Sequence, residues 1–176
     1  MLKQKNMILR LVAIACAVLA FVFMFLPGLS AKEEVMGQTV SGSIGLFGLV
    51  FGGGTMASKM GSISADVKFK GGMSIFALLA FLCLVAAIVV LVLSLVMKGK
   101  TNFVLIGAGL LVLAGIFVLL VKVAGTNITS LAGEVLPEKV SFKDFIDGMN
   151  LGIGSILFAV FAILGGASAA ASNFVK

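Results

Sequence analysis

The side chains that could do acid–base, nucleophilic or metal chemistry are few in this sequence. It has no histidine, and its seven carboxylates all lie in two segments, 28–72 and 124–150. Its two cysteines, Cys16 and Cys83, stand singly among apolar residues, as small packing residues do. A nucleophile needs a base beside it, and a metal site needs clustered histidines, cysteines or carboxylates. The sequence therefore predicts a protein that is not an enzyme, with no catalytic residues, metal site or cofactor.

Charged residues are equally scarce within the long apolar runs of the chain. Rows of acids or histidines inside a membrane are typical of proton relays and ion-coupled transport, and these runs contain none. The charged side chains that they do contain belong to Arg10 and Lys122, near the ends of two runs. A long side chain in such a place can extend to the membrane surface, and we expect both to do so. Nothing in the sequence indicates a small-molecule substrate.

Four apolar runs are long enough to cross a membrane. Crossing a hydrocarbon core of about 30 Å takes about 20 helical residues. The runs are Met7–Leu26, Met73–Met97, Phe103–Val123 and Leu151–Ser172, in a chain of 176 residues that is 61% hydrophobic. We predict an all-α integral membrane protein, a bundle of four transmembrane helices that forms a single membrane domain over residues 1–176.

Charge divides the stretches between these runs into two kinds. Segments 28–72 and 124–150 hold every acid and are close to neutral, whereas the other polar stretches carry only basic residues. Those basic residues are Lys3, Lys5, Arg10, Lys98, Lys100 and Lys176. Because an excess of Lys and Arg marks the cytoplasmic side, we predict a multi-pass protein of the plasma membrane with both termini cytoplasmic and the two acidic segments outside.

The net charge of +6 lies wholly beside membrane spans, so it indicates the lipid bilayer as a partner and no nucleic acid. Lysine outnumbers arginine 12 to 1, and there is no Trp or Tyr. We associate that skew with a bacterial source.

Each apolar run carries small residues at helical spacing along one face. The fourth run is the clearest, with Ser155, Ala159, Ala162 and Gly166 three or four residues apart. Such faces let transmembrane helices approach each other closely. We predict that they are helix-packing residues of a compact bundle, and a face reserved for a second subunit is the alternative. The predicted packing residues of the other runs are Ala13, Ala17 and Ala20, Ala77 and Ala80, and Gly107 and Gly115.

The two acidic segments are too long to be simple connections, and they contain signs of strands. In Ile63–Lys70 apolar and polar residues alternate, which is typical of a half-buried strand. We predict that it pairs with Val35–Ser43 in a small antiparallel sheet, with the glycines at 52–54 marking the connection between them. In the second segment, Ser141–Asp147 is amphipathic, and we expect a turn of helix whose apolar side faces the membrane or the sheet.

An apolar stretch, Ile44–Phe51, interrupts the first of these segments. Glycines within it allow the backbone to come close to other groups. The stretch either packs against the ends of the helices or forms an exposed patch that contacts another subunit, another cell or the bilayer. Its large apolar side chains, our candidate interaction residues, are those of Leu46, Phe47, Leu49, Val50 and Phe51.

The layout of four spans, a longer first outer segment with strands and a shorter second one resembles the claudin-like tetraspan families. Gly45-Leu46-Phe47 is similar to the Gly-Leu-Trp of the claudin first-loop signature, although Phe47 stands where that family has Trp and the cysteine pair of the signature is missing. The resemblance implies lateral assembly within the membrane and contacts through the outer segments.

These observations favour a non-enzymatic four-span membrane protein. We expect it to act by self-assembly, as a homo-oligomer, or as an accessory or scaffold subunit with a membrane-protein partner in a cell-envelope complex. The alternative is an oligomeric channel in which several copies enclose a pore. The polar residues that could line such a pore are Ser74, Ser94, Ser155 and Ser168.

Overall fold

The computed structural model describes residues 2–35, 38–60, 63–96, 101–131 and 134–174. The chain forms two compact units. One, the helical unit, comprises Met1–Phe23, Leu79–Val118 and Leu157–Lys176. The other, the sheet unit, comprises Met24–Leu78 and Leu119–Ile156.

Four long helices account for the four apolar runs. They are α1 (Leu2–Phe23), α3 (Ile75–Val96), α4 (Thr101–Leu119) and α6 (Ile153–Phe174). Each contains an apolar stretch of 18 to 22 residues, long and apolar enough to cross a membrane. The chain therefore has the helices of a multi-pass, four-span membrane protein.

Two of these helices end earlier than the sequence predicts. The first stops at Phe23 instead of Leu26, because the carbonyl groups of the next residues accept hydrogen bonds from outside the helix: Met24 from the N–H of Phe47 and Leu26 from that of Leu46. The third apolar run leaves the helix after Leu119 and forms a turn in which the N–H of Val123 donates to Leu120. Lys122 thus lies in a turn and not in a helix.

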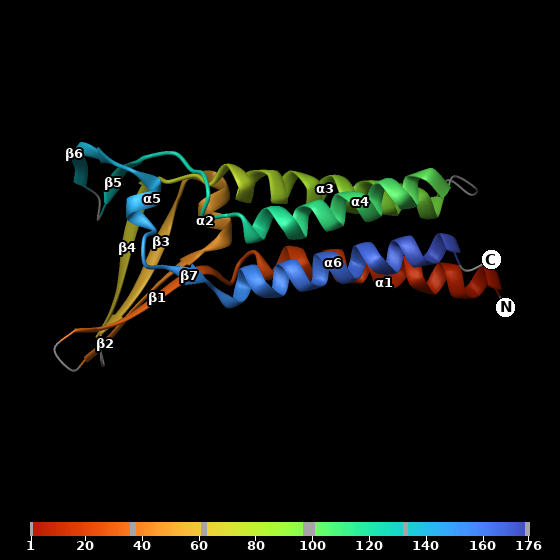
Figure 1. Ribbon diagram of the computed structural model, residues 1–176, viewed down its shortest axis with the longest axis horizontal. Helices are drawn as coiled ribbons and strands as arrows, with labels where there is room; N and C mark the ends of the chain where they lie inside the picture. Colours follow the sequence, from red (N-terminus) through yellow and green to blue (C-terminus); the bar gives the residue numbers. More distant parts are fainter. Residues whose placement is uncertain (1, 36–37, 61–62, 97–100, 132–133, 175–176) are drawn as a thin grey trace. The chain divides into compact units, whose positions relative to one another are not determined.

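Within the helical unit, the four helices form a ring of neighbours. Helix α1 lies beside α6, and α3 beside α4, with both chain termini at one end of the unit (Figure 1). A Cβ atom added to Gly107 of α4 would lie 2.7 Å from Cγ of Leu91 in α3. A Cβ added to Gly166 of α6 would lie 2.9 Å from the carbonyl oxygen of Ala108 in α4. At Gly166 the backbones of α6 and α4 are close, and at Gly107 a leucine of α3 packs on the backbone of α4, as the small-residue faces predict.

The predicted packing residues are all buried in the structure. Ala162 and Ala17 have no exposed surface, and Ala159 has 4%. On the other side of α6, Val160 and Leu164 are exposed. The remaining buried members of the set are Ala13, Ala20, Ala77, Ala80, Gly107, Gly115, Ser155 and Gly166.

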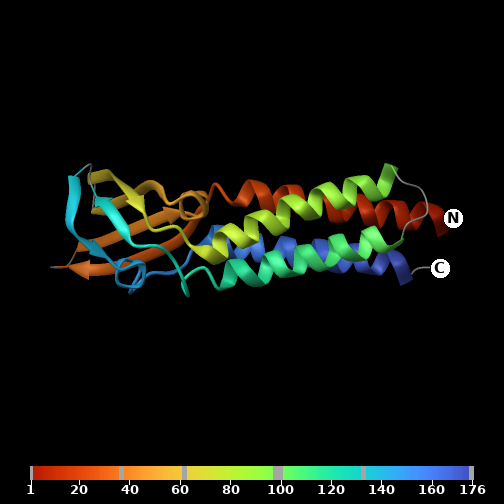
Figure 2. The same cartoon turned by 90° about the horizontal axis from the view of Figure 1, so that it is seen from above.

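The sheet unit is built on one antiparallel sheet of seven strands, so the antiparallel sheet predicted for the acidic segments is present. In chain order the strands are β1 (Pro27–Val35), β2 (Gln38–Gly45), β3 (Gly53–Met60), β4 (Ile63–Gly71), β5 (Ile128–Leu131), β6 (Glu134–Val140) and β7 (Asn150–Leu151). Their order across the sheet is β6-β5-β4-β3-β2-β1-β7, and Figure 2 shows the strands from a second side. The sheet is therefore larger than predicted, and both acidic segments contribute to it.

The pairing of the strands also differs from the prediction. The alternation in Ile63–Lys70 does mark a strand, with Phe69 buried and Asp66 and Lys68 exposed. Its partners, however, are β3 and β5, and Val35–Ser43 falls on β1 and β2, which pair with each other. The misassigned strand is β3, because it begins with glycines that we took to mark a connection. Its Gly54 instead lies opposite Phe69, where the ring needs space.

Two short helices cover the apolar residues of the sheet. Leu29, Ile44, Phe69 and Ile128 come from four different strands, and each is at most 2% exposed. They share the core of the unit with buried side chains of α2 (Leu46–Phe51) and α5 (Phe142–Phe145), which are Leu46, Leu49, Val50, Phe142 and Ile146, the last just after α5.

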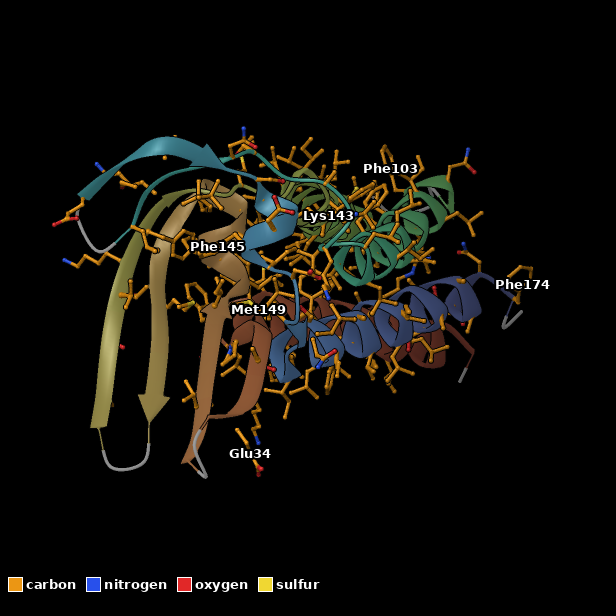
Figure 3. All side chains as sticks on the ribbon, turned by 60° about the vertical axis from the view of Figure 1, so that its left-hand side comes forward. Glu34, Phe103, Lys143, Phe145, Met149 and Phe174 are labelled. Carbon is orange, nitrogen blue, oxygen red and sulfur yellow. The ribbon has the colours of Figure 1, made fainter. Side chains whose placement is uncertain are left out.

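Helix α5 settles which way the amphipathic stretch of the second segment turns. The ring of Phe145 lies 5.8 Å from that of Phe69 in β4 (Figure 3). Phe142 and Ile146 are buried, whereas Lys143 and Asp144 are exposed. The apolar side of this helix therefore faces the sheet.

Candidate interaction surface

The apolar stretch Ile44–Phe51 folds into a short helix because glycines stand at both of its ends. Gly45 precedes α2 in extended conformation, and Gly52 ends it with φ +66°, a left-handed conformation that glycine adopts without strain. The N–H of Gly52 donates to the carbonyl of Gly48, which closes the last turn. The two glycines therefore set the start and the end of this six-residue helix.

Backbone hydrogen bonds attach α2 to the chain at both ends. The N–H of Phe47 lies 3.0 Å from the carbonyl oxygen of Met24, in the turn that follows α1. At the other end, the N–H of Ser74 lies 2.7 Å from the carbonyl oxygen of Leu49. The position of α2 within the sheet unit is therefore fixed by its main chain and does not depend on its outward side chains.

Gly28 provides the close contact on which α2 rests. A Cβ atom at this position would lie 2.8 Å from Cα of Leu46, so a larger residue would push α2 away. The carbonyl oxygen of Gly28 accepts two hydrogen bonds, one from the N–H of Gly152 at 2.8 Å and one from Oγ of Ser155 at 2.7 Å. Three parts of the chain that are far apart in sequence meet at this residue.

The five candidate interaction residues separate into two groups. Leu46, Leu49 and Val50 are fully buried, so they belong to the core of the sheet unit. Phe47 is 36% exposed and Phe51 58% exposed, on the outward side of the same helix. Three of the five residues therefore pack inside the chain, and Phe47 and Phe51 form the exposed part of the stretch.

A third ring joins the exposed pair. Phe25, which is 61% exposed, stacks on Phe47 with ring centroids 5.1 Å apart and an interplanar angle of 21°. Phe47 in turn lies 4.7 Å from Phe51, at an angle of 51°. We call Phe25, Phe47 and Phe51 the phenylalanine cluster. Sequence reasoning missed Phe25 because it lies within the first apolar run, where a phenylalanine carries no distinguishing signal.

The three rings of the phenylalanine cluster can bind another molecule through apolar contacts. Aromatic rings bury a large apolar area and interact with other rings edge-on or offset. Among the described residues, no three His, Cys, Asp or Glu side chains are grouped as a metal site would require. The arrangement is suited to contact with another apolar surface.

Lys122 has a structural position in the same unit. It is half-buried in the turn after α4, and its Nζ donates a hydrogen bond to the carbonyl oxygen of Met149. Met149, which is labelled in Figure 3, is itself buried, with 7% exposure. The Lys122 ammonium group is therefore bonded within its own unit, and its extension to a membrane surface stays a prediction. This hydrogen bond links the turn after α4 to the turn that follows α5.

Three of the four serines considered for a pore lining form hydrogen bonds within the chain. The hydroxyl groups of Ser74, Ser94 and Ser155 are buried and donate to the carbonyl oxygens of Val121, Leu91 and Gly28, at 2.6 to 2.7 Å. Ser168, the fourth, is half-buried in α6. A hydroxyl that satisfies a buried carbonyl of its own chain is a structural group.

The sequence matches no protein-family model and no curated protein. What can be compared with the claudin-like families is the arrangement of the chain. Four helices of membrane-spanning length fit a tetraspan topology.

Proposed function

We propose that this protein is a non-enzymatic, four-span protein of the plasma membrane that acts by assembly, and that copies of the chain contact each other, or a partner in a larger envelope complex, through the sheet unit. The four apolar helices support the membrane location. The phenylalanine cluster supports the assembly, and it is the observation that carries this proposal.

The cluster has the features of an interaction site. Three rings with exposed fractions of 36% to 61% lie together on a backbone that is fixed by hydrogen bonds. Aromatic side chains are enriched where proteins bind each other, because they bury much area and lose little conformational entropy. A fixed backbone lowers the entropy lost on binding further. The same helix buries its other apolar residues, so the exposure of these rings is selective.

The distribution of charge supports an orientation. The basic residues outside the two acidic segments all belong to the helical unit, and the sheet unit contains every acid of the chain. By the excess of Lys and Arg on the cytoplasmic side, both termini are cytoplasmic and the sheet unit lies outside. The claudin-like resemblance belongs to this proposal at the level of layout, with contacts through the outer segments.

A photo-crosslinking experiment tests the assembly. The amino acid p-benzoyl-phenylalanine, which resembles phenylalanine, is placed at Phe47 or Phe51 and irradiated in intact membranes. We expect adducts of discrete mass at both positions, either twice the mass of the chain or the chain plus one partner. The matched control is the exposed strand residue Lys68, which should give none. Adducts with lipid alone at both rings would show that the cluster is a membrane anchor, and would overturn the proposal.

A further inference from the structure

One edge of the seven-stranded sheet is open along about half of β1. On that side, β7 pairs with β1 only at Leu29 and Ser30, which lie opposite Leu151 and Asn150. Among the residues that the structure describes, no strand pairs with Ala31–Val35 on this side, and β2 lies on the other side. The open edge therefore runs from the end of the pairing with β7 to the last residue of β1.

The backbone groups that face this edge belong to alternate residues. The N–H of Gly152 donates to the carbonyl oxygen of Gly28 at 2.8 Å, and the pairing with β7 stays in register up to Ser30. In an antiparallel strand the N–H and C=O of one residue point to the same side, and successive residues alternate. By this alternation Lys32 and Glu34 direct their N–H and C=O groups to the open edge. Such a row of groups is a template for another strand.

The opposite edge of the sheet is protected against such pairing. It is formed by β6, which contains Pro137. Proline has no N–H, so it interrupts the hydrogen bonds that an added strand would form. In β1 the only proline is Pro27, the first residue of the strand. The β1 edge is therefore the one that can accept another strand.

A second copy of β1 fits the open edge in one register. In an antiparallel pair, residues that face the partner lie opposite each other, so Lys32 and Glu34 have to pair among themselves. The register that uses the whole open edge and stops before β7 is centred on Glu33. In that register Lys32 lies opposite Glu34. Ala31 lies opposite Val35, at the two ends of the paired stretch.

Charge favours the same register. The side chains of Lys32 and Glu34 are both exposed, and Glu34 is labelled in Figure 3. Opposite charges that face each other across two strands attract, and like charges repel. Two-fold symmetry makes the Lys32–Glu34 pair occur twice, whereas Glu33 meets its own copy once, on the axis. A shift by two residues in either direction would place Lys32 opposite Lys32 or Glu34 opposite Glu34.

We propose that two copies of the chain pair antiparallel through the β1 edge, about a two-fold axis at Glu33, and so join their sheets into one. Lys32 and Glu34 exchange backbone hydrogen bonds with Glu34 and Lys32 of the second copy, and their side chains form two ion pairs. Five paired residues are few for a stable interface, which takes about 20–30 residues a side. The pairing therefore rests on the assembly proposed for the sheet unit, although its surface is separate from the phenylalanine cluster.

Disulfide cross-linking in native membranes tests this contact. In a background with Cys16 and Cys83 replaced by alanine, Glu33→Cys places two thiols opposite each other, within the roughly 4.4–6.8 Å between Cα atoms that a disulfide spans. With copper phenanthroline as the oxidant, we expect a covalent dimer. Lys32→Cys and Glu34→Cys are the matched controls, because in this register each thiol lies opposite a different residue. Each should give roughly fivefold less dimer, since its own copy is beyond that reach.

Charge reversal tests the register itself. Measured on the Glu33→Cys dimer, Lys32→Glu and Glu34→Lys should each lower cross-linking about threefold, because like charges then lie opposite each other. The two reversals together should restore it, since they form the opposite pairs again. Lys68→Glu, at an exposed position of the interior strand β4, should leave it unchanged. Equal cross-linking of the three cysteine variants, or no rescue by the double reversal, would overturn the proposal.

The outcome at Glu33 can be distinguished from the outcome at the phenylalanine cluster. Photo-crosslinks to a protein at Phe47 without a disulfide in Glu33→Cys would overturn the β1 contact and leave the proposed assembly standing. Absence of both would overturn the two proposals together.

Discussion

The hydroxyl of Ser155, near the start of α6, lies 2.7 Å from the carbonyl oxygen of Gly28, near the start of β1. The two residues are 127 positions apart, and both are buried. The bond joins the first turn of α6 to the start of β1, at the place where α2 packs on Gly28. A residue that the sequence marks as a small packing residue therefore also has a polar role.

Replacing Ser155 with alanine should destabilise the protein by about 1 kcal/mol, because a buried carbonyl loses one of its two donors. The side chain stays small, so packing is preserved. Thermal unfolding followed by circular dichroism in detergent measures the effect. Ser64→Ala, the same change at an exposed position of β4, should leave the midpoint unchanged. If Ser155→Ala unfolds no earlier than this control, the hydrogen bond contributes nothing.

Two glycines of α4 give a matched test of helix packing. Gly107→Leu should destabilise the bundle by about 1–3 kcal/mol, since overpacking forces neighbours to move and the new Cβ would lie 2.7 Å from Cγ of Leu91. A Cβ atom added to Gly109 would meet nothing within 4 Å, so Gly109→Leu should stabilise the helix by about 0.5–1 kcal/mol through the loss of glycine. Thermal unfolding of both variants measures the two effects. Midpoint shifts of the same sign would contradict the packing described for α3 and α4.

Lys122 offers a test of a charge used inside the sheet unit. Lys122→Met keeps most of the apolar stem but removes the donor to the Met149 carbonyl, and we expect a loss of about 1.5–3 kcal/mol, the usual size for a hydrogen bond to a charged group. Lys143→Met, at an exposed position of α5, should have no measurable effect. Chemical unfolding curves compare the two. Equal behaviour would show that Lys122 is a surface charge.

The sequence predicts an element of this fold when the residues that indicate it lie close together in the chain. Length and apolarity identify the four helices, and small residues such as Ala17 and Ala162 identify their buried faces, because both signals are local. The strands are harder. β3 begins with Gly53 and Gly54, and β1 carries Lys32 and Glu34 on its exposed face, so neither shows the alternation of a half-buried strand. Their pairing depends on contacts across the chain.

The candidate surface was predictable only in part, for the same reason. The sequence identifies α2 as an apolar stretch between glycines, but it does not show that Phe47 and Phe51 turn outward while Leu49 turns inward. That division follows from two hydrogen bonds to residues distant in sequence. The N–H of Phe47 donates to Met24, and the N–H of Ser74 donates to Leu49. Phe25 belongs to the surface only because the chain turns after Phe23.

Cysteine labelling tests the proposed orientation. In a background with Cys16 and Cys83 replaced by alanine, Asp66→Cys and Asp144→Cys should react with a membrane-impermeant maleimide in intact cells, since both positions are exposed in the sheet unit. Asn102→Cys, at an exposed position at the start of α4, should react only after the membrane is permeabilised. Labelling of Asn102→Cys in intact cells would reverse the orientation.

The number of chains per particle tests the central claim of assembly most directly. Stepwise photobleaching of a fluorescent fusion, in native membrane discs excised by a copolymer, counts them. We predict more than one copy, or one copy with a partner of constant stoichiometry, and a shift to single, unaccompanied chains in the variant Phe47→Ser with Phe51→Ser. Val140→Ser is the control, because Val140 has the same 36% exposure as Phe47 but lies on β6. Single, unaccompanied chains in the unmodified protein would contradict the account.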